Sequence, residues 1–179
     1  MTQPQQQSLP TPAGEVAFDG DHATLRFVRT YPHPPEAVWA ALTEPEQLAA
    51  WYMTQAVIDG REGGSVQMTS GPARFEWTGR ILTWEPYRLY EYEWNIAPRT
   101  ELPNGEQSVV RWELEPVAEG TKLTLTHRHL TKGTAMGFAP GTHAFMDRLG
   151  DQLGQQPLTN WMQRYDEVKH AYPAWQPNF

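Results

Sequence analysis

The pattern of hydrophobic and polar residues predicts a strand followed by helices near the start of the chain. Residues 22–31 alternate Leu25 and Phe27 with Arg26 and are rich in β-branched and aromatic side chains, which is typical of a strand. The prolines that follow end this strand, and Pro35 suits the first turn of a helix.

Apolar residues recur at helical spacing after these prolines and predict two short helices. The first helix carries Val38, Trp39 and Leu42, and the second carries Leu48 and Trp51. Thr43 and Glu46 have the spacing of a capping box, which predicts that the second helix begins at this point.

Five further segments are predicted to be strands because they are short, rich in β-branched and aromatic residues, and separated by glycine or proline. These segments are residues 66–70, 73–85, 88–96, 108–116 and 121–130. Consecutive strands joined by short turns predict an antiparallel sheet, and the fold class is therefore α+β.

The end of the chain returns to helical spacing. The apolar positions of the two predicted helices are Phe145, Met146, Leu149 and Leu153 in the first, and Leu158, Trp161, Tyr165 and Val168 in the second. Residues 133–143 contain three glycines and a proline, so we expect a loop there. This loop is either a movable gate or ordinary turn chemistry.

Composition places the whole chain in one domain with two tails. The length of 179 residues is that of a single domain. The opening residues are rich in Gln and Pro without periodicity, so we expect residues 1–20 to be a flexible tail and residues 171–179 to be a second tail. The domain is then residues 21–170.

Charge and cysteine content exclude several classes of partner. The net charge is −7, so we expect no nucleic-acid partner and no insertion into a membrane. There is no cysteine, which excludes disulfides and thiolate metal sites. Nothing before Asp21 resembles an export signal, and we expect a cytoplasmic protein. We expect neither a cofactor nor a bound metal.

Motifs spread over most of the chain resemble one known family. The matching positions are Arg29, Val38, Trp39, Leu42, Thr43, Pro45, Leu48, Trp51, Gly79, Ile81, Leu82, Pro86, Arg88, Leu89, Trp94, Gly120, Thr121, Leu123, Leu125 and His127. Together they resemble the Activator of Hsp90 ATPase homologue 1-like family of the START/Bet v 1-like (SRPBCC) superfamily. The resemblance implies the helix-grip fold, in which a curved antiparallel sheet surrounds a C-terminal helix and an internal hydrophobic cavity. Fold membership alone implies no activity.

Three histidines are candidates for polar contacts inside such a cavity. His127 and His129 lie two apart on a predicted strand and so share a face with Leu125. They either pack at the strand end, contact a polar ligand or act as a general base, or bind a metal together with His143.

Aromatic and apolar side chains on the predicted strands and helices complete the candidate ligand-binding set. They either form ordinary core or line a cavity for a flat or lipid-like molecule. These residues are Trp39, Trp51, Trp77, Tyr92, Trp94, Trp112, Phe145 and Met146.

The expected function is therefore the binding of a small hydrophobic, aromatic or lipid-like molecule in an internal cavity, without chemistry on it. We find no catalytic motif. Two alternatives stay open: an enzyme of the cyclase, aromatase or hydrolase kind that uses the same cavity, and a co-chaperone-like interaction domain. A homodimer and a chaperone partner are likewise left open.

Overall fold

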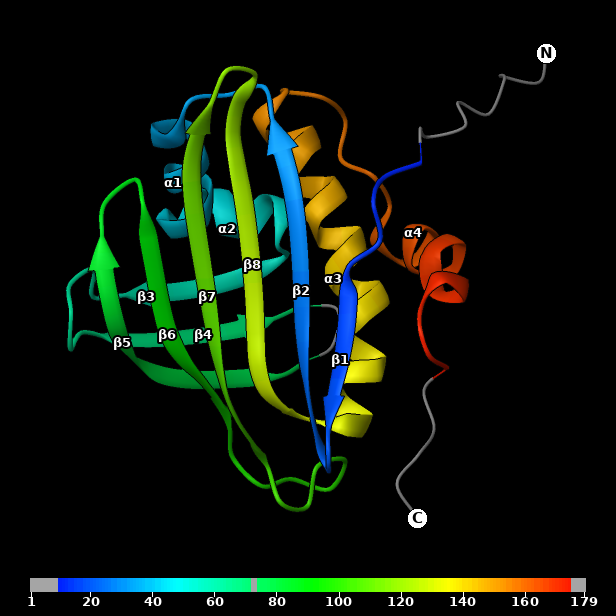
Figure 1. Cartoon of the computed structure of the whole chain (residues 1–179). Helices are drawn as coiled ribbons and strands as arrows, with labels where there is room; N and C mark the ends of the chain where they lie inside the picture. Colours follow the sequence, from blue (N-terminus) through cyan, green and yellow to red (C-terminus); the bar gives the residue numbers. More distant parts are fainter. Residues whose placement is uncertain (1–9, 72–73, 175–179) are drawn as a thin grey trace.

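A computed structural model describes residues 10–71 and 74–174 of the chain (Figure 1). Within these residues, eight strands form one antiparallel sheet in the order β1-β2-β8-β7-β6-β5-β4-β3. The strands are β1 (Glu15–Asp19), β2 (His22–Tyr31), β3 (Thr54–Ile58), β4 (Ser65–Ser70), β5 (Glu76–Glu85), β6 (Leu89–Ile96), β7 (Glu106–Val117) and β8 (Gly120–Thr131). The helices are α1 (Pro35–Thr43), α2 (Pro45–Trp51), α3 (Lys132–Leu153), α4 (Trp161–Val168) and the short 3₁₀ helix η1 (Lys169–Ala171).

The sheet curves around α3, and α1 and α2 close one end of it (Figure 1). Strands β3 and β4 cross the direction of β6, β7, β8 and β2, and β5 bends from the one direction to the other, so the sheet has a concave face that α3 covers (Figure 1). The register pairs Tyr90 with Trp112 and Trp112 with Leu125, which places alternate apolar residues of three strands on this concave face. This is the expected helix-grip fold, and the α+β prediction is confirmed.

Helix α3 begins at Lys132, so the predicted loop over residues 133–143 is wrong. Its first turn is stabilised by the buried carboxylate of Glu106 on β7, which accepts hydrogen bonds from the Thr131 backbone N–H at 2.6 Å and the Thr134 hydroxyl at 2.8 Å. An acidic group at a helix N-terminus also interacts favourably with the helix dipole. The helix nevertheless includes Pro140, which lacks a backbone donor.

Strand β1 (Glu15–Asp19) lies within the segment that was predicted to be the first tail. Strand β1 pairs with β2, and Gly14 donates its backbone N–H to the Tyr172 hydroxyl at 2.8 Å. Tyr172 is buried, so the domain also extends past its expected end at residue 170. The expectation for residues 1–9 and 175–179 lies outside the described residues.

Two local predictions around the short helices also need correction. Helix α2 has Glu44 at its N-cap without a side-chain hydrogen bond, and Thr43 instead donates to the Trp39 carbonyl at 2.8 Å, so the capping box does not form. Strand β3, which pairs with β4, was not anticipated from the sequence pattern. Within the described ranges, no helix combines the length and hydrophobicity that crossing a lipid bilayer requires.

Candidate functional site

A cavity of about 430 Å³ lies between the concave face of the sheet and helices α3 and α4. From the sheet side it is lined by Ser70, Phe75, Trp77, Trp94 and His127, with Tyr52 at the end of α2. Helix α3 contributes Phe138, Thr142 and Phe145, and α4 contributes Trp161, Met162 and Tyr165. The lining is therefore mostly aromatic.

The aromatic lining residues hold one another in place. The Trp77 and Trp94 rings lie 5.1 Å apart on neighbouring strands, and Phe138 packs edge-on against Trp94 at 5.3 Å. On the other side, Tyr52 and Phe145 make an edge contact at 4.7 Å. Because these rings contact one another, the side chains of the cavity wall restrict one another's movement.

His127 is the buried polar residue at the centre of the sheet-side wall. Its exposed fraction is 7%, and its ring lies 5.1 Å from the Trp94 ring. Burial lowers the pKa of His127 to about 3, because the apolar surroundings disfavour the charged imidazolium. The ring is therefore neutral at physiological pH. Its Nε2 atom lies 2.8 Å from the hydroxyl oxygen of Ser108 on β7.

The remaining polar lining groups are hydroxyls, one carboxylate and the indole N–H groups of three tryptophans. The Trp77 indole N–H has no hydrogen-bond partner among the described residues, but it is fully enclosed and so is not open to the cavity. Burial raises the pKa of Tyr52, so its phenol stays protonated. Among the described lining residues, Asp166 is the one charged group, and it pairs with Lys169 at 2.9 Å on the exposed side of α4. The described lining contains no lysine or arginine.

Helix α4 forms one wall of the cavity because it packs closely on α3. The indole N–H of Trp161 donates to the Gly141 carbonyl at 3.2 Å, and the Tyr165 hydroxyl donates to the Gly137 carbonyl at 3.3 Å. A Cβ at Gly141 would come within 3.0 Å of the Trp161 ring, so glycine allows the two helices to approach.

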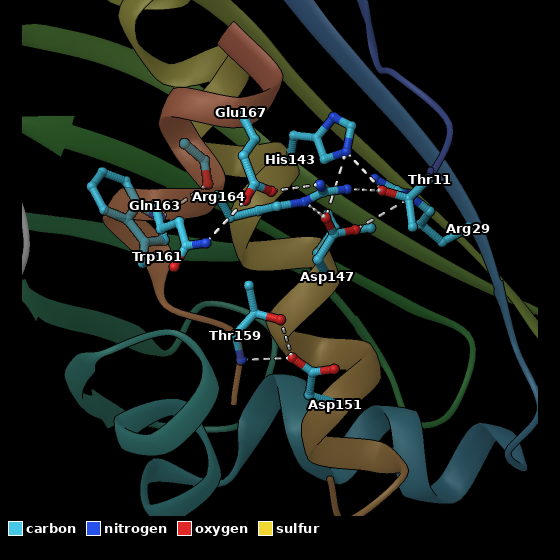
Figure 2. A network of polar contacts seen from close by, with 12 residues as sticks. Thr11, Arg29, His143, Asp147, Asp151, Thr159, Trp161, Gln163, Arg164 and Glu167 are labelled. Atoms are coloured by element: carbon cyan, nitrogen blue, oxygen red, sulfur yellow. Dashed lines mark hydrogen bonds and ion pairs between the residues drawn. The ribbon is translucent and has the colours of Figure 1, made fainter. Parts of the chain in front are cut away.

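A buried ionic network fixes α4 from the side away from the cavity (Figure 2). Asp147 on α3 lies 2.6 Å from Arg164 Nε on α4 and 3.5 Å from Arg29 Nη1 on β2. Arg164 also pairs with Glu167 at 3.0 Å and donates to the Thr11 hydroxyl at 3.1 Å. The carboxylate therefore joins the sheet, α3 and α4.

The segment between α3 and α4 is tied down by two more polar residues. Asp151 accepts hydrogen bonds from the backbone N–H and the hydroxyl of Thr159 at 2.8 and 2.7 Å (Figure 2). Arg148 donates to the carbonyls of Trp51 and Ala50, each at 2.8 Å, and so caps the C-terminus of α2. The cavity walls from α2, α3 and α4 are thus held together.

The structure brings most of the sequence-predicted residues to the cavity or beside it. Trp77, Trp94, His127 and Phe145 line it, whereas Trp51, Trp112 and Met146 line an adjoining void of about 30 Å³. Tyr92 is buried on the same face of the sheet and stacks on Tyr90 at 4.8 Å.

Three predicted residues lie elsewhere. Trp39 packs against Trp84 at 5.0 Å, outside the cavity lining. The predicted shared face of His127 and His129 is wrong, because a bulge gives His129 a φ of 63° and leaves it exposed. His143 is buried between the hydroxyls of Thr11 and Tyr172 at 2.8 and 2.7 Å.

Several lining residues were missed by the sequence reasoning. Phe138 and Thr142 lie on the same helical face as Phe145, at positions four and three residues apart. This spacing identifies them as lining residues once the helix is known to begin at Lys132. Ser108 lies behind the lining and was also missed, because its contact with His127 depends on the pairing of β6, β7 and β8.

Solved structures resemble this fold over most of the chain. The CalU16 protein of Micromonospora echinospora superposes with a TM-score of 0.68 at 23% identity, covering 90% of this chain and 96% of its own. Protein MLL2253 of Mesorhizobium loti gives 0.67 at 26% identity, covering 75% of this chain and 99% of its own. The BPP1335 protein of Bordetella parapertussis gives 0.66 at 24% identity, covering 93% and 94%.

Comparisons of the sequence itself identify a family. No curated protein matches the chain. Residues 32–154 match the family described as Activator of Hsp90 ATPase homolog 1-like protein, and this segment spans more than half of the chain. It includes α1, α2, the strands β3 to β8 and the whole of α3. The chain therefore belongs to the Activator of Hsp90 ATPase homolog 1-like family.

Proposed function

We propose that the protein binds a small, mainly apolar molecule between its sheet and helices α3 and α4, without chemistry of its own. The aromatic cavity of about 430 Å³ carries this proposal. Its volume falls within the range of roughly 300–1,000 Å³ typical of small-molecule sites. Its lining has the expected composition of aromatic surfaces with a few fixed polar groups.

Energetics favour an occupied cavity over mere packing. Trp77 and Trp94 are 3% and 4% exposed, yet both border a space that no protein atom fills. The space is partly open to solvent, so its aromatic walls face water when no ligand is bound. An apolar ligand removes this surface from water, so ligand binding should also stabilise the fold.

His127 and Ser108 do not favour the enzymatic alternative. A serine beside a histidine is the arrangement of many nucleophile and base pairs. Ser108, however, is 3% exposed, is not part of the cavity lining, and donates its hydroxyl proton to the Trp94 carbonyl at 2.9 Å. The histidine therefore has no proton to take from it.

Titration with the uncharged fluorescent probe N-phenyl-1-naphthylamine tests the proposal. Trp94→Ala removes a wall of the cavity, so affinity should fall by at least ~1 kcal/mol, about fivefold. Trp39→Ala removes the same side chain from a part of the core outside the cavity lining and serves as the matched control. Circular dichroism verifies that both variants are folded.

A cavity-filling variant gives a second, independent readout. Thr142→Phe places a ring in the space that the ligand would occupy, so probe binding should be abolished while the midpoint of thermal unfolding is kept or raised. The proposal would be refuted if the unmodified protein did not bind the probe. It would also be refuted if the folded Trp94→Ala and Thr142→Phe variants bound the probe as tightly as the unmodified protein does.

A further inference from the structure

Ser108 determines which ring nitrogen of His127 carries the proton. The Ser108 Oγ atom lies 2.9 Å from the Trp94 carbonyl oxygen and 2.8 Å from His127 Nε2. Two oxygen atoms at that separation require a proton between them, and a carbonyl has none, so Ser108 donates to Trp94. The Ser108 hydroxyl has only this one proton, so it cannot also donate to His127. The contact between Ser108 Oγ and His127 Nε2 can therefore be a hydrogen bond only if Nε2 carries a proton and donates it to Ser108.

The other ring nitrogen of His127 is consequently a bare acceptor. A neutral imidazole protonated at Nε2 carries a lone pair at Nδ1. Among the described residues Nδ1 has no hydrogen-bond partner, and it is not one of the fully enclosed unpaired atoms. Because His127 lines the cavity, this lone pair is open to whatever occupies the cavity.

The described cavity lining around Nδ1 offers no positive charge. The nearest rings are Trp94 at 5.1 Å and Phe138 at 6.5 Å. The described lining holds no lysine or arginine, so a buried carboxylate or phosphate would lack a counter-charge. Burying an unpaired ion is costly, and this disfavours fatty acids and other anions.

The hydroxyl groups of the lining do not distinguish a ligand that donates a hydrogen bond from one that accepts it, because a hydroxyl can do either. Ser70, Thr142 and Tyr52 are therefore permissive contacts. His127 differs from them, since its protonation state and tautomer are both set by groups behind the cavity wall.

We infer that the cavity selects uncharged aromatic molecules that carry a hydrogen-bond donor, such as a phenolic or alcoholic hydroxyl, and that His127 Nδ1 accepts that hydrogen bond. This inference rests on the proposed function and adds the ligand class. A ligand whose only polar atom is an acceptor, such as an ether, meets a lone pair at this position and gains nothing from His127.

Isothermal titration with substituted naphthalenes tests the ligand class. 2-Naphthol and 2-methylnaphthalene have nearly the same shape but differ in the donor, 2-methoxynaphthalene offers only an acceptor, and 2-naphthoate is anionic. His127→Phe keeps a ring at the position and removes the acceptor. The informative quantity is the affinity ratio of 2-naphthol to each of the others, compared between the two proteins.

The affinity ratio of 2-naphthol to each of the two uncharged analogues should be roughly 3- to 10-fold larger in the unmodified protein than in His127→Phe. This factor is the range expected for one net hydrogen bond. 2-Naphthoate should bind at least about tenfold more weakly than 2-naphthol. Equal ratios in both proteins, or tight binding of 2-naphthoate, would overturn the inference and leave the proposed function standing. Failure of every naphthalene to bind the unmodified protein would overturn both.

The tautomer is measurable without any core substitution. Long-range ¹H–¹⁵N correlations of the imidazole ring should show His127 protonated at Nε2 only. Ser108→Ala removes the group that holds this tautomer, so the preference for 2-naphthol over 2-methoxynaphthalene should shrink. A proton on Nδ1 in the unmodified protein, or an unchanged preference in Ser108→Ala, would contradict the assignment of His127 as the acceptor.

Discussion

Asp147→Asn removes the negative charge on which the buried network at α4 depends. The side chains of Arg29, Asp147 and Arg164 are 6%, 9% and 9% exposed. Asn has nearly the same shape as Asp, so the substitution changes charge with little change in packing. In the variant Arg164 keeps Glu167, but Arg29 loses the carboxylate beside it.

The expected cost follows from leaving buried guanidinium groups without that charge. Removing one partner of a buried ion pair typically costs 3–5 kcal/mol. The Asn amide oxygen still accepts a hydrogen bond from Arg164 Nε, which lies 2.6 Å from the present carboxylate oxygen. We therefore expect the lower end of the range, a loss of about 3 kcal/mol in the free energy of unfolding.

Urea unfolding followed by circular dichroism measures this loss as a lower midpoint at unchanged slope. Glu115→Gln is the control, because Glu115 pairs with Lys122 at 3.4 Å and the two are 65% and 41% exposed, so its removal should cost at most ~0.5 kcal/mol. Hydrogen exchange in α4 should also accelerate more than in β8. A loss below ~1 kcal/mol, equal to that of the control, would refute the reasoning.

Two further predictions concern pH and strand packing. Unfolded His127 takes up a proton near pH 6.5 whereas the folded protein does so only near 3, so the unfolded state binds more protons between these values and stability falls as the pH is lowered. Urea titrations at several pH values from 7 to 4 give the free energy of unfolding as a function of pH. In His127→Phe this free energy should fall less steeply as the pH is lowered, by up to ~1.4 kcal/mol per pH unit. Burial lowers the pKa of His143 to about 4, and its contribution has the same sign. Gly79→Ala should cost at least ~2 kcal/mol in urea unfolding, because a Cβ there overlaps the Glu93 carbonyl oxygen. Exposed Thr78→Ala, expected within ~0.5 kcal/mol, is its control, and equal values for the two would contradict this reasoning.

Period-two patterning predicted β2 and β4 to β8 together with the cavity residues Trp77, Trp94 and His127, but it did not predict β1 or β3. Trp94, Trp112 and His127 lie on the concave face as their alternation indicates, because no bulge intervenes between them. Alternation fails at His129, where one residue with a positive φ reverses the side-chain direction. A histidine in that conformation leaves no sequence signal, since glycine is the residue expected there.

The start of α3, and with it the cavity residues Phe138 and Thr142, could not be predicted because the contact that stabilises this start comes from a residue distant in the sequence. Glycines and Pro140 make the first turns of α3 resemble a loop. The compensating contact comes from Glu106 on β7, and a pairing of this kind cannot be found from local propensity. His143, which was one of the candidate ligand-binding residues, lies outside the cavity lining because about 200° of helical rotation separates it from the cavity residue Phe145.

Two residues of strand β7 act on the cavity in different ways, one on the position of α3 and the other on the hydrogen-bonding state of His127. Glu106 stabilises the first turn of α3, and Ser108, two residues later on the same face, orients the proton on His127. A one-residue insertion before Glu106 leaves this spacing intact, whereas one between the two residues places them on opposite faces. Ligand preference in related chains should therefore diverge by substitution of lining side chains, with the length of this part of β7 held constant.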